Sequence, residues 1–328
     1  MTLKLFALSG GRGGIAEGVA AELGWPLAAL EERDFEDGEH KARPLEEVRG
    51  DDVYVIAGLH GDAGQSPNDR LCRLLFFIGA LRTGGAARVT AVIPYLAYAR
   101  KDRQTKPRDP LTARYVAQLV EAVGTDRVVA LEVHNLAAFQ NAFRCEALAL
   151  DLRGVLLDRA AGLAGEGAVC VASPDPGGVK RAQLFREALE TRLDREVGFA
   201  VLEKRRSAGV VTGELMAGEV QGARVLVIDD MIASGGTMVR AADALRGAGA
   251  RDVWALAAHG LFTGNAPEAL KSDALAGWIV TDSVPPFRLE RAGAAARLEI
   301  VSAAPLFARA ILRLRDEGDV TDLPAAGS

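Results

Sequence analysis

Short apolar runs alternate along almost the whole chain with alanine- and leucine-rich stretches of helical length. The runs predicted as strands are Leu3–Leu8, Val53–Ala57, Val89–Ile93, Val128–Val133, Val169–Ala172, Phe199–Leu202, Val225–Ile228, Val253–Ala257 and Trp278–Val280. The stretches predicted as helices include Arg70–Leu81, Thr112–Val123 and Thr237–Leu245. The strand runs are apolar throughout, as expected when both faces of a sheet are buried. The alternation predicts an α/β protein with mainly parallel sheets flanked by helices.

The same order of strands and helices occurs twice along the chain. At roughly 100–200 residues per domain, the length also favours two domains. We expect similar α/β domains over residues 1–155 and 156–315, and a polar tail over residues 316–328. The segment Arg153–Gly167, with its glycines and alanines, is expected to connect the two domains.

The composition argues against several classes of protein. A net charge of −5 disfavours a general nucleic-acid binder, because such proteins are usually basic. No apolar run approaches the roughly 18 residues of a membrane-spanning helix. Three cysteines without a CxxC pair disfavour a disulfide framework or a zinc ribbon and suit a reducing cytoplasm. We therefore expect a cytoplasmic protein without a nucleic-acid or membrane partner.

The segment Val225–Thr237 is the most informative motif. Two aspartates follow four apolar residues, and a short glycine-containing loop then precedes a predicted helix. The residues of interest are Asp229, Asp230, Ser234, Gly235, Gly236 and Thr237. A glycine loop that opens a helix presents unpaired backbone N–H groups and a positive dipole end, which suit a phosphate monoester. The carboxylates are suited to ribose hydroxyls or to hydrated Mg²⁺. A lone Gly-Gly would instead be interpreted as a simple tight turn.

A second group of polar segments also follows predicted strands. The segment Tyr95–Arg108 is rich in cations, which suits a polyphosphate, although a solvated basic loop is an equally good interpretation of this segment alone. His134 ends one strand, and Asp175 lies between two prolines after another. Taken alone, His134 is more often structural than a metal ligand or a phosphate donor. Lys204–Arg206 follow a further strand, where a flexible loop over Ser207–Gly218 could close on a phosphoryl group. Composition alone favours a surface patch for these three cations.

Taken together, these segments resemble the ribose-phosphate diphosphokinases, also called PRPP (phosphoribosyl diphosphate) synthetases. The resemblance runs from about residue 3 to residue 312. The matching segments, in chain order, are FEDGE (Phe35–Glu39), SPNDRL (Ser66–Leu71), VIPYLAYARKDR (Val92–Arg103), LEVHN (Leu131–Asn135), SPDPGGVKRA (Ser173–Ala182), EKRR (Glu203–Arg206), VIDDMIASGGT (Val227–Thr237) and HGLFTGNA (His259–Ala266). Their collinearity is far more specific than any one of them.

The resemblance implies two type I phosphoribosyltransferase-like domains with the active site between them. It implies Mg²⁺-dependent transfer of a diphosphoryl group from ATP to the 1-hydroxyl of ribose 5-phosphate, giving PRPP and AMP. Ser234–Thr237 would hold the 5-phosphate, and Asp229 and Asp230 the ribose hydroxyls. The ATP-binding residues would be Phe35, Asp37, Glu39, Arg100, Lys101, Asp102, Arg103 and His134. His134 and Asp175 would organise the metal, while Lys204 and Arg206 would act on the transition state.

The resemblance also implies a homo-oligomer that is built from dimers, with a hexamer as one form. Phe35, Asp37 and Glu39 would reach the adenine bound by a neighbouring subunit. Ala233 stands where the family usually carries Asp or Ser, so one side-chain contact of the phosphate loop is expected to be missing. Two alternatives remain open: a non-catalytic paralogue that regulates an active enzyme, and a phosphoribosyltransferase that consumes PRPP.

Overall fold

The computed structural model describes the chain except for residues 1, 12, 208–209, 291–295, 317 and 319–328 and the side chains of 204–215 and 290. Two compact units make up the chain. The first comprises residues 1–151 and the segment that begins at Ser302, and the second comprises residues 152–301. Within the described residues, none of the helices has the length and apolar character needed to cross a membrane.

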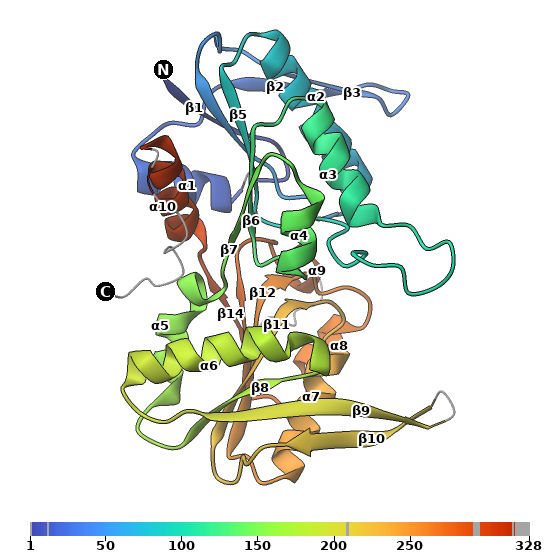
Figure 1. Ribbon diagram of the computed structural model, residues 1–328, viewed down its shortest axis with the longest axis vertical. Coiled ribbons are helices and arrows are strands. Elements are labelled where there is room, and N and C mark those ends of the chain that lie inside the picture. Colours follow the sequence, from blue (N-terminus) through green and yellow to red (C-terminus); the bar gives the residue numbers. More distant parts are fainter. Residues whose placement is uncertain (1, 12, 208–209, 291–295, 317, 319–328) are drawn as a thin grey trace. The chain divides into compact units, whose positions relative to one another are not determined.

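The first unit contains a parallel sheet of five strands (Figure 1). In spatial order the strands are β1 (Leu3–Ala7), β4 (Asp52–Ile56), β5 (Arg88–Ile93), β6 (Arg127–Leu131) and β7 (Glu146–Leu150). All five residues of β4 are buried. Burial on both faces explains why the predicted strands are continuous apolar runs rather than alternating ones.

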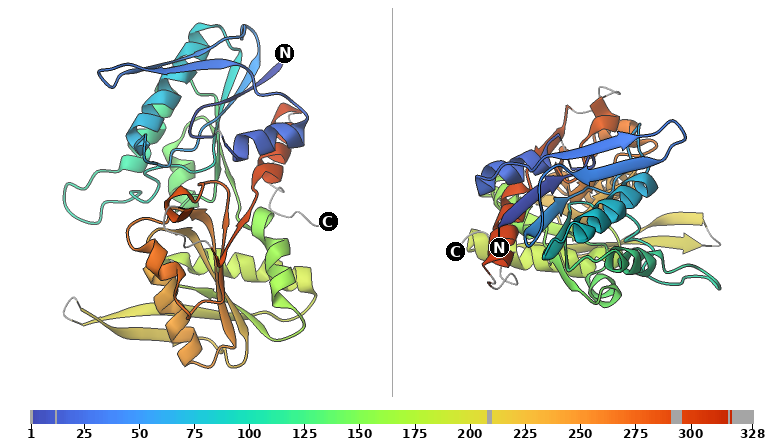
Figure 2. Two further views of the ribbon diagram at one scale, coloured as in Figure 1. Left: turned by 180° about the vertical axis from the view of Figure 1, so that it is seen from behind. Right: turned by 90° about the horizontal axis from the view of Figure 1, so that it is seen from above.

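Helices cover both faces of this sheet. They are α1 (Ile15–Leu23), α2 (Pro67–Thr83), α3 (Thr112–Ala122), α4 (Leu136–Ala142) and α10 (Ala304–Arg315). Figures 1 and 2 show α2 and α3 on one side of the sheet and α1 and α10 on the other. Gly18 lets α1 and α10 approach closely, since a Cβ there would lie 2.8 Å from the Ala304 Cβ. The sequence assigned the residues of α10 to the second domain, whereas this helix packs within the first unit.

A two-stranded antiparallel hairpin, β2 (Leu30–Asp34) and β3 (His40–Pro44), packs on α2. The His40 ring stacks on Phe76 of α2 with a centroid separation of 5.3 Å. The hairpin was not predicted, because its strands are mostly charged and lack the apolar alternation of a half-buried strand.

The second unit contains a sheet of seven strands. In spatial order they are β10 (Val210–Ala217), β9 (Gly198–Ser207), β8 (Val169–Ser173), β11 (Arg224–Ile232), β12 (Asp252–Gly260), β13 (Gly277–Thr281) and β14 (Leu298–Val301). Only β10 is antiparallel to its neighbour among these described strands. The prediction of a flexible loop over Ser207–Gly218 is therefore wrong, since most of that segment is strand β10. Apolar and polar residues do not alternate regularly along this segment of the sequence, so the pattern did not predict a strand.

The remaining elements lie around this second sheet. They are α5 (Arg153–Ala164), a 3₁₀ turn η1 (Pro176–Gly178), α6 (Val179–Leu193), α7 (Gly236–Gly247), α8 (Ala266–Leu270) and α9 (Phe287–Glu290). The connection predicted over Arg153–Gly167 is mostly helix α5, and that prediction is wrong. Figures 1 and 2 show α5 and α6 on one face and α7 and α8 on the other.

The strand order of the second unit reverses at β8. The chain passes from β8 to β9 on one side, and β11 lies on the other side of β8. The segments that follow β8 and β11 therefore lead to helices on opposite faces of the sheet. In open α/β sheets, ligands bind at the carboxyl ends of the strands flanking such a point.

Candidate active site

The glycine-containing loop after β11 is a tight turn into helix α7. Gly235 has a φ of +76°, and α7 begins at Gly236. A Cβ on Gly235 would lie 2.8 Å from the Ala269 Cβ and 3.3 Å from the Trp278 ring. Both the backbone conformation and the packing therefore require glycine at this position. The first amides of α7 have no partner within the helix and face the space that an anion would occupy.

The segment after β12 supports this loop from behind. The Ile232 carbonyl accepts hydrogen bonds from the amides of Leu261 at 2.9 Å and Phe262 at 3.2 Å. The Ala233 carbonyl accepts one from the Thr263 amide at 2.8 Å. These main-chain bonds fix the loop without any contribution from the side chain at position 233. The structure thus builds a tight backbone turn at the segment where the sequence predicts a phosphate site, and Ser234 and Thr237 lie in this turn.

The two aspartates lie within β11 rather than after it, because the strand continues to Ile232. Asp230 is almost fully buried, and its amide donates to Asp229 Oδ1 at 2.9 Å. Burial and the neighbouring Asp230 carboxylate raise the pKa of Asp229 well above its ordinary value. Arg181 of α6, whose Nη1 lies 3.6 Å from Asp229 Oδ1, acts in the opposite direction. A further cation or a hydroxyl donor beside Asp229 would act in the same direction as Arg181 and favour the charged carboxylate.

Asp175 follows β8, the neighbour of β11 at the reversal point. Its Oδ1 accepts hydrogen bonds from the amides of Gly177 at 2.8 Å and Gly178 at 3.2 Å. The Ser173 hydroxyl donates to the Asp175 carbonyl at 2.7 Å. These bonds hold the carboxylate in a fixed turn. Arg181 follows this turn on α6 and contacts Asp229. The sequence analysis did not select Arg181, although its position four residues after Gly177 could have indicated it.

The basic loop between β5 and α3 is held together by Asp109. Oδ2 of this residue accepts hydrogen bonds from the Lys101 ammonium at 2.6 Å, the Thr105 hydroxyl at 2.8 Å and the amides of Thr105 and Lys106. The Lys101 bond and the Thr105 bond lower the pKa of Asp109 far below its ordinary value. The sequence analysis did not select Asp109, although it is an acid placed at the end of a run of cations.

The structure joins two of the predicted ATP-binding segments of the first unit, the end of β6 and the basic loop. Asn135, which follows His134, donates from Nδ2 to Asp102 Oδ2 at 2.7 Å and so links the end of β6 to the basic loop. His134 itself is exposed. Arg100 and Arg103 are also exposed, and neither forms an ion pair with another residue that the structure describes. Their guanidinium groups are accessible to an anionic ligand.

Phe35, Asp37 and Glu39 lie in the turn of the β2–β3 hairpin. The Phe35 amide donates to the Glu39 carbonyl at 2.8 Å, and the Glu39 amide donates to Asp37 Oδ1 at 3.0 Å. The Arg33 guanidinium lies 5.2 Å from the centre of the exposed Phe35 ring. The turn is thus ordered by its own hydrogen bonds and presents an aromatic face to the outside.

The two predicted catalytic cations are only partly described. Lys204 and Arg206 lie on β9, and the backbone there pairs antiparallel with β10 at Glu214 and Val211. The side chains of both residues lie outside the described part of the chain.

A cavity of about 740 Å³ opens at the opposite end of the first sheet. Lys4, Trp25, Asp52 and Arg88 are among the residues that line it, and no predicted site residue is. These residues lie near the amino ends of parallel strands, whereas ligands of such sheets bind at the carboxyl ends. We therefore assign the candidate site to the loops described above.

The chain is similar along nearly its whole length to known proteins of one family. Residues 3–124 match the model of the N-terminal domain of ribose phosphate pyrophosphokinase, and residues 213–323 match the phosphoribosyl synthetase-associated domain. A ribose-phosphate pyrophosphokinase of Caldanaerobacter subterraneus is 38% identical over 94% of each chain, and one of Hyphomonas neptunium is 36% identical over 98% of this chain and 99% of its own. The crystal structure of phosphoribosylpyrophosphate synthetase from Mycobacterium smegmatis superposes with a TM-score of 0.85 at 32% identity, covering 97% of this chain and all of the other.

Proposed function

Because this chain belongs to the ribose-phosphate pyrophosphokinase family and shares its enzyme activity, we propose that it transfers the diphosphoryl group of ATP to the 1-hydroxyl of ribose 5-phosphate. The products are PRPP and AMP. The observation that carries this assignment is the glycine turn at Ser234–Thr237, separated by three residues from the adjacent Asp229 and the buried Asp230. This arrangement suits a ligand that has both a phosphate monoester and vicinal hydroxyls.

The second unit binds ribose 5-phosphate in this proposal. The amides of Gly235, Gly236 and Thr237 hold the 5-phosphate, with the hydroxyls of Ser234 and Thr237 as further donors. Asp229 and Asp230 accept hydrogen bonds from the ribose hydroxyls. The high pKa of Asp229 supports this role, because a hydroxyl donor or a cation stabilises a carboxylate that burial has disfavoured.

The first unit binds ATP. Arg100 and Arg103 contact the polyphosphate, and His134 is a further donor beside them. Lys101 and Asp102 contribute mainly by shaping the basic loop through Asp109 and Asn135. Phe35, Asp37 and Glu39 bind the adenine of a neighbouring subunit, so the enzyme is a homo-oligomer.

Transfer of the diphosphoryl group requires an in-line arrangement of the attacking and leaving oxygens and stabilisation of the charge that they share. We assign Lys204 and Arg206 to this stabilisation. A cation that acts mainly on the transition state raises turnover more than it tightens substrate binding. Replacing Lys204 by alanine should therefore lower kcat much more than it raises the KM for ribose 5-phosphate.

Mg²⁺ is the proposed metal cofactor. The carboxylates of Asp229 and Asp230 fit this ion, since hard cations prefer oxygen ligands and a nearby cation offsets the burial that disfavours the charged form of Asp229. Asp175 offers a further carboxylate and His134 a weaker nitrogen donor, which is less suited to this ion. When bound, the ion would neutralise phosphate charge and orient the polyphosphate.

The decisive experiment measures AMP and PRPP formation by the purified protein with ATP, Mg²⁺ and ribose 5-phosphate. We expect both products in equal amounts, and none when ribose replaces ribose 5-phosphate. Binding of both substrates without AMP formation would identify the non-catalytic paralogue. PRPP consumption with a purine or pyrimidine base, without dependence on ATP, would identify the phosphoribosyltransferase.

A further inference from the structure

Helix α2 contains two buried arginines to which the sequence analysis gave no role, although Arg70 lies within the segment SPNDRL. Arg70 is 5% exposed and Arg73 is 6% exposed. Burying a guanidinium costs free energy unless it is paired and hydrogen-bonded. Each arginine therefore holds its partners in position. The partners of the two residues lie in different segments of the first unit.

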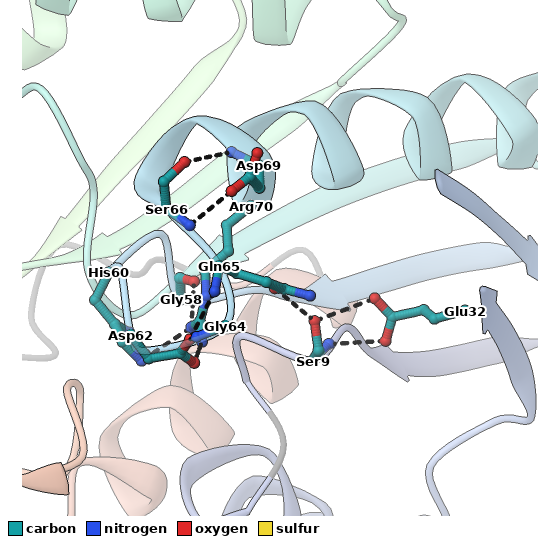
Figure 3. A network of polar contacts seen from close by, with 10 residues as sticks. All are labelled: Ser9, Glu32, Gly58, His60, Asp62, Gly64, Gln65, Ser66, Asp69 and Arg70. Atoms are coloured by element: carbon teal, nitrogen blue, oxygen red, sulfur yellow. Dashed lines mark hydrogen bonds and ion pairs between the residues drawn. The ribbon is translucent and has the colours of Figure 1, made fainter. Parts of the chain in front are cut away.

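Arg70 organises the loop that follows β4 (Figure 3). Its Nη1 donates to the Gly58 carbonyl at 3.3 Å and lies 2.9 Å from His60 Nε2, and its Nη2 pairs with Asp62. Because a guanidinium only donates, His60 Nε2 must accept, and the ring is neutral. Asp62 Oδ1 in turn accepts hydrogen bonds from the amides of Gly64 at 2.7 Å and Gln65 at 2.8 Å.

This loop is attached to the start of the basic loop. The Leu59 amide donates to the Tyr95 carbonyl at 3.0 Å. There is a second link two residues before Arg70 on α2, where the Tyr98 hydroxyl bonds to Asn68. Arg70 therefore holds the segment against which the polyphosphate-binding loop rests.

Arg73, one helical turn further along α2, organises the hairpin instead. Its Nη2 pairs with Asp34 and its Nη1 lies 3.9 Å from Glu32 Oε1, both on β2. Glu32 also accepts a hydrogen bond from the Ser9 amide at 2.9 Å (Figure 3). Asp34 directly precedes Phe35, so the ion pair lies at the base of the turn that ends at Glu39.

We propose that Arg70 and Arg73 are positioning residues with separate targets: Arg70 holds the polyphosphate-binding loop, and Arg73 orients the turn that recognises the nucleobase. The two ligand roles rest on the proposed function, whereas the two mechanical roles rest on the contacts alone. Two residues of one helix thus support different properties: Arg70 supports affinity for the phosphates, and Arg73 supports selectivity for the base. A purely stabilising role would not distinguish the two segments.

The mechanical part is tested by hydrogen exchange of the full chain with Arg70→Met and Arg73→Met. Arg73→Met should accelerate exchange of the Phe35 and Gly38 amides at least tenfold and leave those of Gly64 and Gln65 unchanged. Arg70→Met should do the reverse. Arg82→Met is the matched control, because Arg82 also lies on α2 but pairs with Asp126, and it should affect neither segment. Equal acceleration of both segments by each variant, or of neither, would overturn the proposal.

Partner-side variants keep the test valid if a methionine variant does not fold. The Asp34 and Asp62 side chains are 66% and 33% exposed, so Asp34→Asn and Asp62→Asn disturb the interior less. Each should accelerate exchange only in its own segment, by a smaller factor. Acceleration of the other segment by either variant would contradict the separation.

The kinetic part compares ATP with GTP as the diphosphoryl donor. Arg73→Met should lower the ratio of kcat/KM for ATP over GTP about tenfold, and Arg73→Lys should restore part of it. Arg70→Met should raise the KM for both nucleotides by a similar factor of about ten and leave their ratio unchanged. An unchanged ratio in Arg73→Met would refute the selectivity role. A wild-type protein that forms no AMP would refute the proposed function instead, and the exchange result would still stand.

Discussion

The phosphate loop after β11 and the basic loop after β5 both follow a buried strand, but they are built in different ways. The phosphate loop is short and fixed by backbone hydrogen bonds and by a glycine with a φ of +76°. The basic loop spans Tyr95 to Asp109 and is held by the side chains of Asp109 and Asn135.

The difference has a physical consequence for binding. Backbone amides in a tight turn fixed by main-chain bonds move little, so they suit one small group of fixed shape, such as a monoester. The long exposed side chains of Arg100 and Arg103 can adjust to a flexible polyphosphate. We therefore expect changes to the phosphate loop to be severe and changes to the basic loop to be graded.

The largest effect is expected for Gly235→Ala. The new Cβ would lie 2.8 Å from the Ala269 Cβ in a backbone conformation that disfavours side chains. We expect kcat/KM for ribose 5-phosphate to fall more than a hundredfold, and the free energy of unfolding to fall by about 1–3 kcal/mol. Gly247→Ala, at the far end of α7 where a Cβ meets nothing within 4 Å, is the control and should change neither quantity for the worse. Full activity in Gly235→Ala would contradict a rigid phosphate loop.

Asp229→Asn, in the same region, should lower the activity but raise the thermal stability. We expect a loss of about a hundredfold in kcat/KM for ribose 5-phosphate. The pKa of Asp229 is raised in the folded state, so its ionisation destabilises the fold as pH rises from the ordinary carboxyl value through the folded pKa. The variant should therefore have a higher Tm than the wild type at pH 8, and the difference should vanish near about pH 3.5. Thermal unfolding across this range measures it, and a lower Tm at pH 8 would contradict a strained carboxylate pair.

Asp109→Asn tests the basic loop. Losing its bonds to Lys101 and Thr105 should raise the KM for ATP about tenfold and leave the KM for ribose 5-phosphate unchanged. The pKa of Asp109 is lowered, so its support of the loop is complete above the ordinary carboxyl pKa and is lost only as pH falls through the folded value. Asp109 therefore stays ionised between about pH 8 and 5, and its titration should not change the wild-type KM for ATP in this range. Asp273→Asn, which removes an exposed acid of the second unit, serves as the control.

The smallest effect is expected for Asn135→Ser. Serine can still cap α4, where the Asn135 side chain accepts from the Ala138 amide, but it is too short to reach Asp102. We expect a rise of about threefold in the KM for ATP and a stability change within about 0.5 kcal/mol. A rise as large as that of Asp109→Asn would mean that the link between β6 and the basic loop is as important as the internal bonds of the loop.

The sequence predicted the elements whose signal is local. The nine apolar runs became strands, with bounds shifted by a few residues; β11, for instance, continues to Ile232. The glycine loop was predicted correctly because strand, glycines and helix are contiguous. The β2–β3 hairpin was missed because its strands are stabilised by contacts with α2, and α5 was mistaken for a connection because its two glycines weaken the helical signal.

The repeated alternation of strands and helices, the order of the polar segments and the residue types of each loop follow from the amino-acid sequence alone, since these depend on neighbouring residues. The packing of α10 in the first unit and the hydrogen bond from Asn135 to the basic loop depend on the three-dimensional fold. The fold also decides that the buried Arg73 pairs with Asp34, which lies 39 residues away. A buried charge is compensated by whichever group the fold brings close to it. The residues adjacent to Arg73 in the sequence do not indicate which group that is.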